Sequence, residues 1–241
     1  MDPTERFTSR ASDYATHRPA YGDDVLDFVL TGLGPEPRVA DLGAGTGISS
    51  RLLAAHGARV MAVEPNAAMR AQAQPTPGIT FVDGTGERTT LGTSSVDAAT
   101  AFQAFHWFNA PEALAEIRRI VRPGGAAALV LNERDERDPL SAAYGDIVRR
   151  YALDGTERRR MESMDAFEAL SGTVERRRFP NQQTLDRDGL LGRTRSTSYL
   201  PHDGAAAEAL EHEVSELFAQ HATDGRLRLA LVTWVVRAKM P

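Results

Sequence analysis

The chain has 241 residues, a formal net charge of −5 and no cysteine. This length suits one substantial domain with its own core, and the lack of cysteine excludes disulfides, thiolate metal ligands and cysteine nucleophiles. The acidic balance argues against a nucleic-acid partner, since phosphate contacts usually require a basic protein face.

Apolar runs of strand length alternate with helical patterns along the first half of the chain. Residues 1–37 are expected to form a helical cap over a sheet, with one apolar stripe made of Val25, Leu26, Val29 and Leu30. Strands are predicted at 38–42, 59–64, 79–82, 96–101 and 126–131, and helices at 48–56, 66–73 and 111–122. Strands that alternate with helices favour a parallel sheet covered by helices on both faces.

The second half of the chain has a different rhythm. Strands are predicted at 173–179 and 226–239, with a helix between them whose apolar face carries Leu210, Val214, Leu217 and Phe218. Two late strands joined by a long connection indicate an antiparallel addition at one end of the sheet. The charge run at 133–138 is predicted to be an exposed loop, and the basic runs at 158–160 and 176–178 to be solvated faces of a helix and a strand.

A glycine-rich loop follows the first predicted strand of the sheet. It reads Asp41-Leu42-Gly43-Ala44-Gly45-Thr46-Gly47 and leads into the next helix. Glycine at every second position lets the backbone turn sharply and lets a ligand approach closely. The helix N-terminus adds unpaired N–H groups and a positive dipole end. Ligands of open parallel sheets bind in this crevice, at the carboxyl ends of the strands.

The spacing of the loop indicates which ligand it binds. A dinucleotide site requires Gly-x-Gly-x-x-Gly, whereas this loop reads Gly-x-Gly-x-Gly, with Asp41 two residues before the first glycine. A carboxylate at that place would repel a pyrophosphate and suits a ligand with a positive centre. Glu64 ends the second strand, 17 residues after Gly47, where a carboxylate accepts hydrogen bonds from ribose hydroxyls. These features predict S-adenosylmethionine as cofactor, with S-adenosylhomocysteine as product.

Three segments resemble motifs of the class I S-adenosylmethionine-dependent methyltransferases: 39–47, 63–66 and 81–87. The resemblance implies a single Rossmann-like α/β domain with a seven-stranded, mostly parallel sheet and one antiparallel strand. It implies a cofactor-binding core at 38–131 and a substrate-side part at 132–241. It also implies a set of cofactor-binding residues: Gly43, Ala44, Gly45, Thr46, Gly47, Glu64, Pro65, Met69, Gly84, Thr85 and Gly86. Thr85 stands where the family often has an acid that meets the adenine amine.

Within this class the chain resembles the trans-aconitate methyltransferase-like subgroup. The likeness lies in residues 7–21, 103–108 and 196–201. It implies a lid in which Tyr14 and Arg18 contact the methionine carboxylate or the substrate. The alternative is an N-terminal helix with a packed tyrosine and a solvated arginine.

The segment after the fourth strand borders both the cofactor and the substrate in such a fold. Phe102 and Gln103 are predicted to bind the methionine ammonium. His106 is the candidate general base, because its ordinary pKa is near neutrality; the alternative is a histidine that only packs between aromatic rings. Further residues are expected to line the substrate pocket, although ordinary structural roles fit them as well: Tyr21, Trp107, Ser198 and Tyr199.

The sequence thus predicts methyl transfer from S-adenosylmethionine to an O, N or C atom of a small-molecule acceptor. A carboxylate acceptor would require no base, whereas a hydroxyl or an amine would favour His106 as one. Two alternatives stay open: a non-catalytic S-adenosylmethionine-binding regulator or partner subunit, and a protein or RNA methyltransferase. No His, Asp and Glu cluster has the spacing of a metal site, so no metal is expected.

The sequence also bounds where the protein works and with what partners. No stretch approaches the roughly 20 apolar residues of a membrane span. Residues 1–6 are polar and lack the apolar core of a secretory signal. We therefore expect a cytoplasmic monomer or homodimer with no membrane partner.

Overall fold

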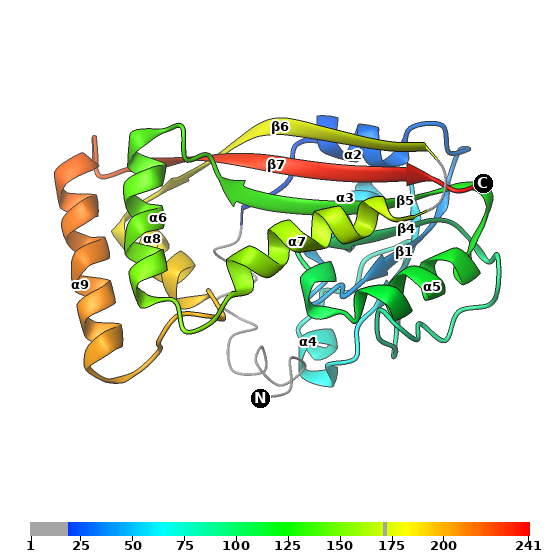
Figure 1. Ribbon diagram of the computed structural model, residues 1–241, viewed down its shortest axis with the longest axis horizontal. Helices are drawn as coiled ribbons and strands as arrows, with labels where there is room; N and C mark the ends of the chain where they lie inside the picture. The colour runs from blue at the N-terminus through cyan, green and yellow to red at the C-terminus, as the bar shows by residue number, and fades with distance from the viewer. Residues whose placement is uncertain (1–18, 171–172) are drawn as a thin grey trace.

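The computed structural model describes residues 19–170 and 173–241, and these form an α/β structure around one seven-stranded sheet (Figure 1). The sheet order is β3-β2-β1-β4-β5-β7-β6. The five strands of the first half run parallel to one another, and β7 runs antiparallel to both β5 and β6. The strands are β1 (Arg38–Leu42), β2 (Arg59–Val63), β3 (Ile79–Val82), β4 (Val96–Phe102), β5 (Val121–Arg134), β6 (Thr173–Leu185) and β7 (Leu227–Lys239). The predicted mostly parallel fold with one antiparallel strand is confirmed.

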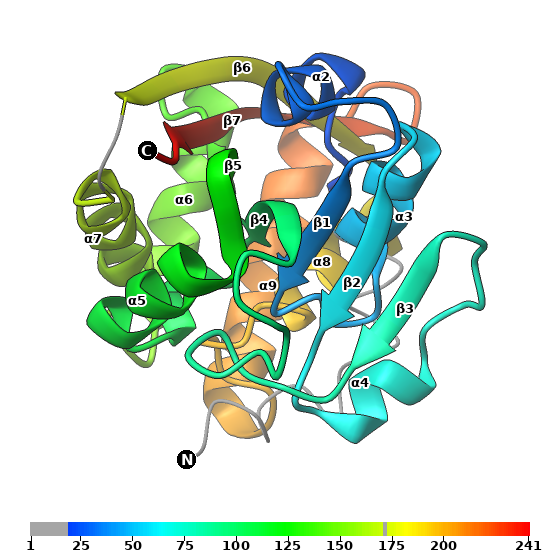
Figure 2. The same cartoon turned by 90° about the vertical axis from the view of Figure 1, so that its right-hand side faces the viewer.

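Helices cover both faces of the sheet, as Figure 2 shows. On one face α2 (Asp23–Leu30) and α3 (Ile48–Ala55) pack their apolar side chains on the sheet. On the other face lie α5 (Ala110–Ile120) and α7 (Thr156–Glu168). The short elements α4 (Ala67–Ala71) and η1 (Phe105–Trp107) follow β2 and β4. The stripe predicted before residue 38 is confirmed in α2, where Val25, Leu26 and Val29 are buried.

A third group of helices extends the molecule beyond the carboxyl end of β5 (Figure 1). It consists of α6 (Pro139–Tyr151), α8 (Arg187–Arg195) and α9 (Gly204–His221), which share an apolar core with the ends of β6 and β7. The predicted apolar face of α9 is confirmed, with Leu210, Val214 and Leu217 buried. This extension stands at the edge of the sheet where open α/β folds bind ligands.

Two sequence predictions about charged segments hold only in part. The run at 133–138 does not begin in an exposed loop: Glu133 and Arg134 are the last residues of β5, and their side chains are largely enclosed. Arg160 of the run at 158–160 is also buried, on the inner side of α7. The cause is the same in both segments. Glu133 pairs with Arg160 and Arg134 pairs with Glu157 inside the protein, and these ion pairs compensate for the lost solvation.

The predicted end of β6 at Phe179 is also wrong, because the strand continues to Leu185. It is an edge strand, and most of its side chains are exposed or half-buried. Such a strand carries little apolar patterning, so its end is poorly marked in sequence. Across residues 19–170 and 173–241, no helix has the length and apolarity to cross a membrane.

Candidate active site

The glycine loop turns tightly at the carboxyl end of β1. Gly43, Gly45 and Gly47 have φ values of 69°, 59° and 80°, in the left-handed region that favours glycine. A Cβ atom on Gly43 would also lie 2.6 Å from the Cβ of Ala104. The backbone N–H groups of Gly43 and Ala44 both donate to the carbonyl of Val63, at 2.9 and 3.1 Å. The loop is therefore fastened to the end of β2 before α3 begins.

Asp41 lies beneath the loop and does not face a ligand. Its carboxylate is fully buried and accepts hydrogen bonds from the hydroxyls of Ser49 and Ser50, at 2.7 Å each, and of Thr100, at 3.2 Å. Burial raises the pKa of Asp41 to about 6. The three hydroxyls turn this carboxylate inward and fix the first turn of α3, so Asp41 does not line the cavity described below.

Glu64, by contrast, connects three parts of the site. Its Oε2 accepts from the N–H of Gly45 at 2.9 Å, and its Oε1 accepts from the N–H of Asn66 at 2.8 Å. Burial raises the pKa of this carboxyl group above its usual value. Glu64 also lines the cavity described next. One carboxylate thus holds the glycine loop to the start of α4 while part of it faces the cavity.

A cavity of about 280 Å³ runs along the carboxyl ends of the parallel strands, from the β2–β3 side to β5. Its lining confirms that most of the predicted residues come together: Tyr21, Gly43, Ala44, Gly45, Thr46, Glu64, Pro65, Met69, Thr85, Gly86, Phe102, Gln103 and Trp107. These residues come from five separate stretches of the chain, at 21, 43–46, 64–69, 85–86 and 102–107. The family motifs and the fourth strand therefore build one common site.

The far wall of this cavity joins predicted residues to Pro19, Ala20 and Asn132, which were not predicted as site residues. Gln103 has a φ of 53°, which is uncommon for a residue other than glycine, and its Nε2 donates to the carbonyl of Asn132 at 2.7 Å. The Asn132 amide in turn donates to the carbonyls of Pro19 and Ala20, at 3.4 Å each. Beside these hydrogen bonds, the ring of Tyr21 packs edge-on against the ring of Phe102, with 4.9 Å between the ring centroids. These contacts hold residues 19–21 at the cavity beside β4 and β5.

Other lining residues also escaped sequence reasoning. They are Pro19, Ile48, Ser49, Asn66, Glu87, Ala104, Phe108 and Asn132. In the structure a Cβ on Gly86 would lie 2.5 Å from the ring of Phe108, so this glycine leaves room for an aromatic wall. Asn66 is the N-cap of α4, and its side chain accepts from the N–H groups of Ala68 and Met69. That role is local, and it gave no hint of a place at the cavity.

Several predicted residues lie elsewhere. Gly47 and Gly84 do not line the cavity. A Cβ on Gly47 would lie 2.9 Å from the ring of Phe81, and a Cβ on Gly84 would lie 2.8 Å from the carbonyl oxygen of Thr89. Both glycines therefore allow close packing. His106 and Ser198 do not line the cavity either. The ring of His106 lies 4.8 Å from that of Trp107 and its Nδ1 is buried, which gives the role of general base no support.

Tyr14 and Arg18 lie outside the described residues, so the predicted lid stays a prediction.

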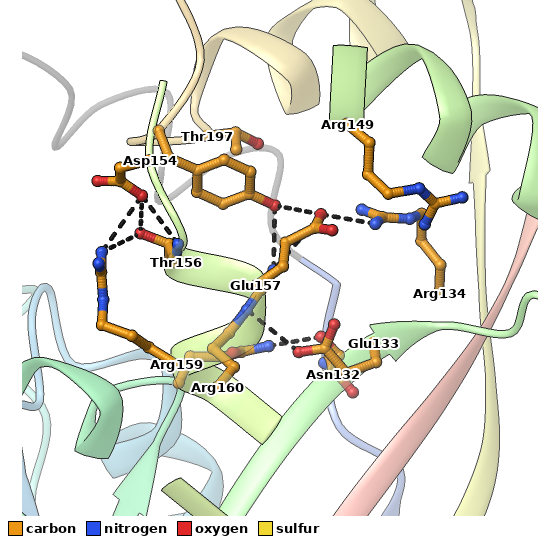
Figure 3. Close-up of polar contacts among 12 residues, drawn as sticks. Asn132, Glu133, Arg134, Arg149, Asp154, Thr156, Glu157, Arg159, Arg160 and Thr197 are labelled. Atoms are coloured by element: carbon orange, nitrogen blue, oxygen red, sulfur yellow. Dashed lines mark hydrogen bonds and ion pairs between the residues drawn. The ribbon is translucent and has the colours of Figure 1, made fainter. Parts of the chain in front are cut away.

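Tyr199 belongs to a second, smaller cavity, which we call the polar annex. It has a volume of about 30 Å³ and shares Pro19, Gln103 and Asn132 with the main cavity. Its other walls are Glu133, Arg134, Tyr144, Val148, Arg160, Arg193, Thr197 and Tyr199. Figure 3 shows the charged side chains of this region pointing toward one another from β5 and α7. The annex therefore lies beside the β5 end of the main cavity.

Charged and phenolic groups of the annex form one connected network. Arg134 Nη2 lies 2.6 Å from Glu157 Oε1, and the hydroxyl of Tyr199 donates to the same oxygen at 2.9 Å. Arg160 Nη2 donates to the Tyr199 hydroxyl at 3.0 Å, while its Nε lies 3.3 Å from Glu133 Oε1. Burial raises the pKa of the Tyr199 hydroxyl. Within the described part of the chain, no group of three or more acidic or histidine side chains is placed to hold a metal ion.

The parallel sheet, the glycine loop after β1 and the acid at the end of β2 form an arrangement typical of α/β proteins that bind an adenosine-containing cofactor. Residues 40–129 match the family described as "Methyltransferase domain". An uncharacterized methyltransferase of Mycobacterium tuberculosis is 34% identical over 245 residues, which cover 99% of this chain and 97% of that protein. The chain therefore belongs to the class I S-adenosylmethionine-dependent methyltransferases.

More distant relatives agree with this assignment. A demethylmenaquinone methyltransferase of Renibacterium salmoninarum is 30% identical over 163 residues, 67% of each chain. Among solved structures, a provisionally named type II methyltransferase of Anaeromyxobacter dehalogenans superposes with a TM-score of 0.71 and 26% identity, over 93% of this chain and 99% of that one. The likeness to the trans-aconitate subgroup is not confirmed by these relatives.

Proposed function

We propose that the main cavity binds S-adenosylmethionine and that the protein transfers its methyl group to an O, N or C atom of a small molecule. The observation that carries this proposal is the position of Glu64: a buried carboxylate that faces the cavity and at the same time accepts from the N–H of Gly45. A carboxylate in this place suits two ribose hydroxyls. The glycine loop beside it carries only small side chains, so it leaves room for the methionine part of the cofactor.

The lining residues divide into two ends on this proposal. Met69, Thr85 and Gly86 lie at the β2–β3 end and would enclose the adenine. Gly43 to Thr46 would contact the methionine part, together with Phe102 and Gln103 at the end of β4. Gln103 is suited to orient a polar group, because its amide is fixed by the bond to Asn132. The substrate would then enter beside Tyr21 and Trp107.

Positioning is the main contribution that these residues would make to the reaction. S-adenosylmethionine supplies a methyl group on a sulfonium, which is already a good leaving group. The carboxylates that line the main cavity within residues 19–170 and 173–241 are those of Glu64 and Glu87, and Tyr21 adds a phenol. Glu64 binds two backbone N–H groups, and Glu87 accepts from the N–H of Asn109 at 2.7 Å. The acceptor would therefore be activated by alignment with the methyl group and by exclusion of water rather than by a base.

A small-molecule acceptor is supported by the shape of the site and by one relative. The polar annex is small, and it is walled by helices of the C-terminal extension. The relative from Renibacterium salmoninarum carries the name of an enzyme that acts on demethylmenaquinone, a small molecule. The acidic net charge of −5 gives no support to a nucleic-acid acceptor.

Isothermal titration of the full chain with S-adenosylmethionine tests the cofactor half of this proposal. We expect binding at micromolar strength or tighter. Glu64→Gln should weaken it, whereas Glu36→Gln, the same change at an exposed carboxylate paired with Arg59 far from the cavity, should not. Absence of heat at a cofactor concentration of about 100 μM would refute the proposal. Formation of S-adenosylhomocysteine across a panel of small phenols, amines and acids tests the transfer itself.

A further inference from the structure

Three polar side chains meet on the face of the sheet that α2 covers. They are Asn132 of β5, Thr233 of β7 and Asn181 of β6, three neighbouring strands, and we call them the Asn132 cluster. Each stands two residues along its strand from a member of the apolar core beneath α2: Val130, Val235 and Phe179. Because side chains two apart in a strand share a face, the cluster interrupts an apolar surface. Its members therefore need partners within the protein.

The cluster orients the side-chain amide of Asn132. The Oδ1 of Asn132 accepts from the hydroxyl of Thr233 at 2.5 Å and from the Nδ2 of Asn181 at 3.1 Å. An amide whose oxygen has two donors presents its nitrogen elsewhere. The Nδ2 of Asn132 donates to the carbonyls of Pro19 and Ala20, at 3.4 Å each, and the Nδ2 of Asn181 donates to the carbonyl of Ala20 at 3.0 Å. The cluster thus fastens the chain to the sheet just before α2 begins.

The main chain of Asn132 holds a second part of the cavity wall. Its carbonyl accepts from the Nε2 of Gln103 at 2.7 Å, and the N–H of Gln103 donates to the carbonyl of Val130 at 2.9 Å. These two bonds support the left-handed conformation of Gln103, whose φ is 53°. A residue other than glycine adopts this conformation at a cost, and such residues are concentrated at functional sites. Asn132 therefore bonds both to Gln103 and to the residues that precede Tyr21.

The two parts that Asn132 joins both line the main cavity, whereas Asn181 and Thr233 do not. Tyr21 directly follows the fastened carbonyls, and its position depends on them. The rate of a transfer reaction is sensitive to such positions, since a displacement of about 1 Å can lower it about a hundredfold. The cluster is thus connected to the site through the backbone of residues 19–21.

Fold stability alone does not require the Asn132 cluster. Apolar side chains of the same shape, in place of a buried group of hydrogen-bonded partners, can be neutral or stabilising. The other end of α2 has an attachment of its own, because the Arg237 guanidinium donates to the carbonyls of Val29 and Thr31. In between, Val25 and Leu26 are buried on the sheet. The polar cluster adds a defined position for the backbone of residues 19–21, which apolar packing would not give.

We propose that Asn132, Asn181 and Thr233 are positioning residues for the methyl transfer: they fix Tyr21 relative to Gln103, so that the acceptor atom is aligned with the methyl group. This inference rests on the proposed function, because it concerns alignment in the same site. In that step an electron pair of the acceptor forms the bond to the methyl carbon. The carbon–sulfur bond breaks, its electrons stay on sulfur in S-adenosylhomocysteine, and a proton released by the acceptor passes to solvent.

An isosteric pair of variants on β6 tests the attachment. Asn181→Asp keeps the size of the side chain but replaces the donor Nδ2 by an oxygen, which faces the acceptor oxygens of Ala20 and Asn132. Gln182→Glu is the matched control, since it is the same change of amide to carboxylate at the next residue of the strand. Gln182 is exposed, and its Oε1 accepts from Arg228, a bond that the carboxylate keeps.

The ring of Tyr21 reports its own position. In the full chain labelled with 3-fluorotyrosine, the Tyr21 signal in the fluorine NMR spectrum is the one lost in Tyr21→Phe. The ring of Phe102, 4.9 Å away between centroids, makes this signal sensitive to displacement. We expect Asn181→Asp to shift or broaden it and Gln182→Glu to leave it unchanged. A Tyr21 signal that is the same in Asn181→Asp as in the unaltered protein overturns the proposal.

The buried hydroxyl of Thr233 gives a second test, with a conservative rescue. Thr233→Val keeps the shape of the side chain and removes the hydroxyl, whereas Thr233→Ser keeps the hydroxyl. With an acceptor from the panel above, kcat/KM for the acceptor should fall about tenfold in Thr233→Val and recover in Thr233→Ser. The Kd of S-adenosylmethionine should stay within about threefold, because the carbonyl that holds Gln103 is unaltered. Equal kcat/KM in the two variants contradicts positioning; if the panel yields no acceptor, their Tyr21 signals decide in the same way.

Failure of the positioning and failure of the proposed function give different results. A protein that binds S-adenosylhomocysteine but keeps its Tyr21 signal in Asn181→Asp retains the proposed function and loses the positioning role. A protein whose Tyr21 signal moves as expected but that does not bind S-adenosylhomocysteine retains the attachment of residues 19–21 and loses the proposed cofactor.

Discussion

Replacing Asp41 by asparagine should change how the stability of the protein depends on pH. The folded protein raises the pKa of Asp41 from 3.8 to about 6, chiefly because the carboxyl group is fully buried beneath the glycine loop. A shift of about two units corresponds to about 3 kcal/mol. The folded state binds a proton more tightly than the unfolded state does. Asp41 therefore favours folding most below about pH 4, and this contribution is lost as the pH rises through 6.

Asp41→Asn has no such titration and keeps the shape of the side chain. Ser49, Ser50 and Thr100 have hydroxyls that rotate, so they still satisfy an amide. We expect the free energy of unfolding of the unaltered protein, minus that of the variant, to fall by about 2–3 kcal/mol between pH 4 and pH 7. As the pH rises from 4 to 7, the stability of the variant should therefore increase relative to that of the unaltered protein.

Urea unfolding followed by circular dichroism at half-unit pH intervals measures this difference. Asp27→Asn, at an exposed position of α2, is the matched control. A difference between Asp41→Asn and the unaltered protein that stays constant from pH 4 to pH 7 would refute the reasoning. It would mean that the three hydroxyls compensate the buried charge fully.

Further variants test the site itself. Glu64→Gln should weaken S-adenosylmethionine binding about tenfold or more in titration calorimetry, because an amide oxygen cannot accept from both backbone N–H groups and the ribose as a carboxylate does; unchanged affinity would remove Glu64 from the cofactor site. Gly86→Ala places a methyl group 2.5 Å from the ring of Phe108 and should displace that wall, with a loss of cofactor affinity and a lower Tm by calorimetry; an alanine variant equal to the unaltered protein would show that the wall is not rigid. His106→Gln should keep turnover within about twofold in an assay of S-adenosylhomocysteine formation, whereas a loss of about a hundredfold would restore it as a base.

The first half of the fold was predictable because its signals are local. A glycine loop, the strand before it and the acid at the next strand end lie within a short stretch of chain, from Arg38 to Glu64. Each strand there is buried on both faces, so it reads as a continuous apolar run. The strands at 38–42 and 79–82 have the boundaries that were predicted.

Direction and partners of the side chains were not predictable in the same way. The sequence places a carboxylate at Asp41, but it cannot say that three hydroxyls from α3 and β4 turn it inward. It likewise shows Gln103 after the fourth strand, but not the bond to Asn132 that fixes the amide. These contacts join residues far apart in the chain, and periodicity within one segment carries no information about them.

The polar annex is the clearest case of a site that only the tertiary structure decided. Glu133 and Arg160 each stand in a run of charges, and a run of charges is ordinarily solvated. In the structure β5 and α7 bring the two side chains together, so that each compensates the other away from water. The sequence by itself determined the glycine loop and Glu64, because a tight turn needs particular residues at particular places. Which charges are buried was decided by the packing of distant elements, because the cost of burying a charge depends on its partners and not on its neighbours in sequence.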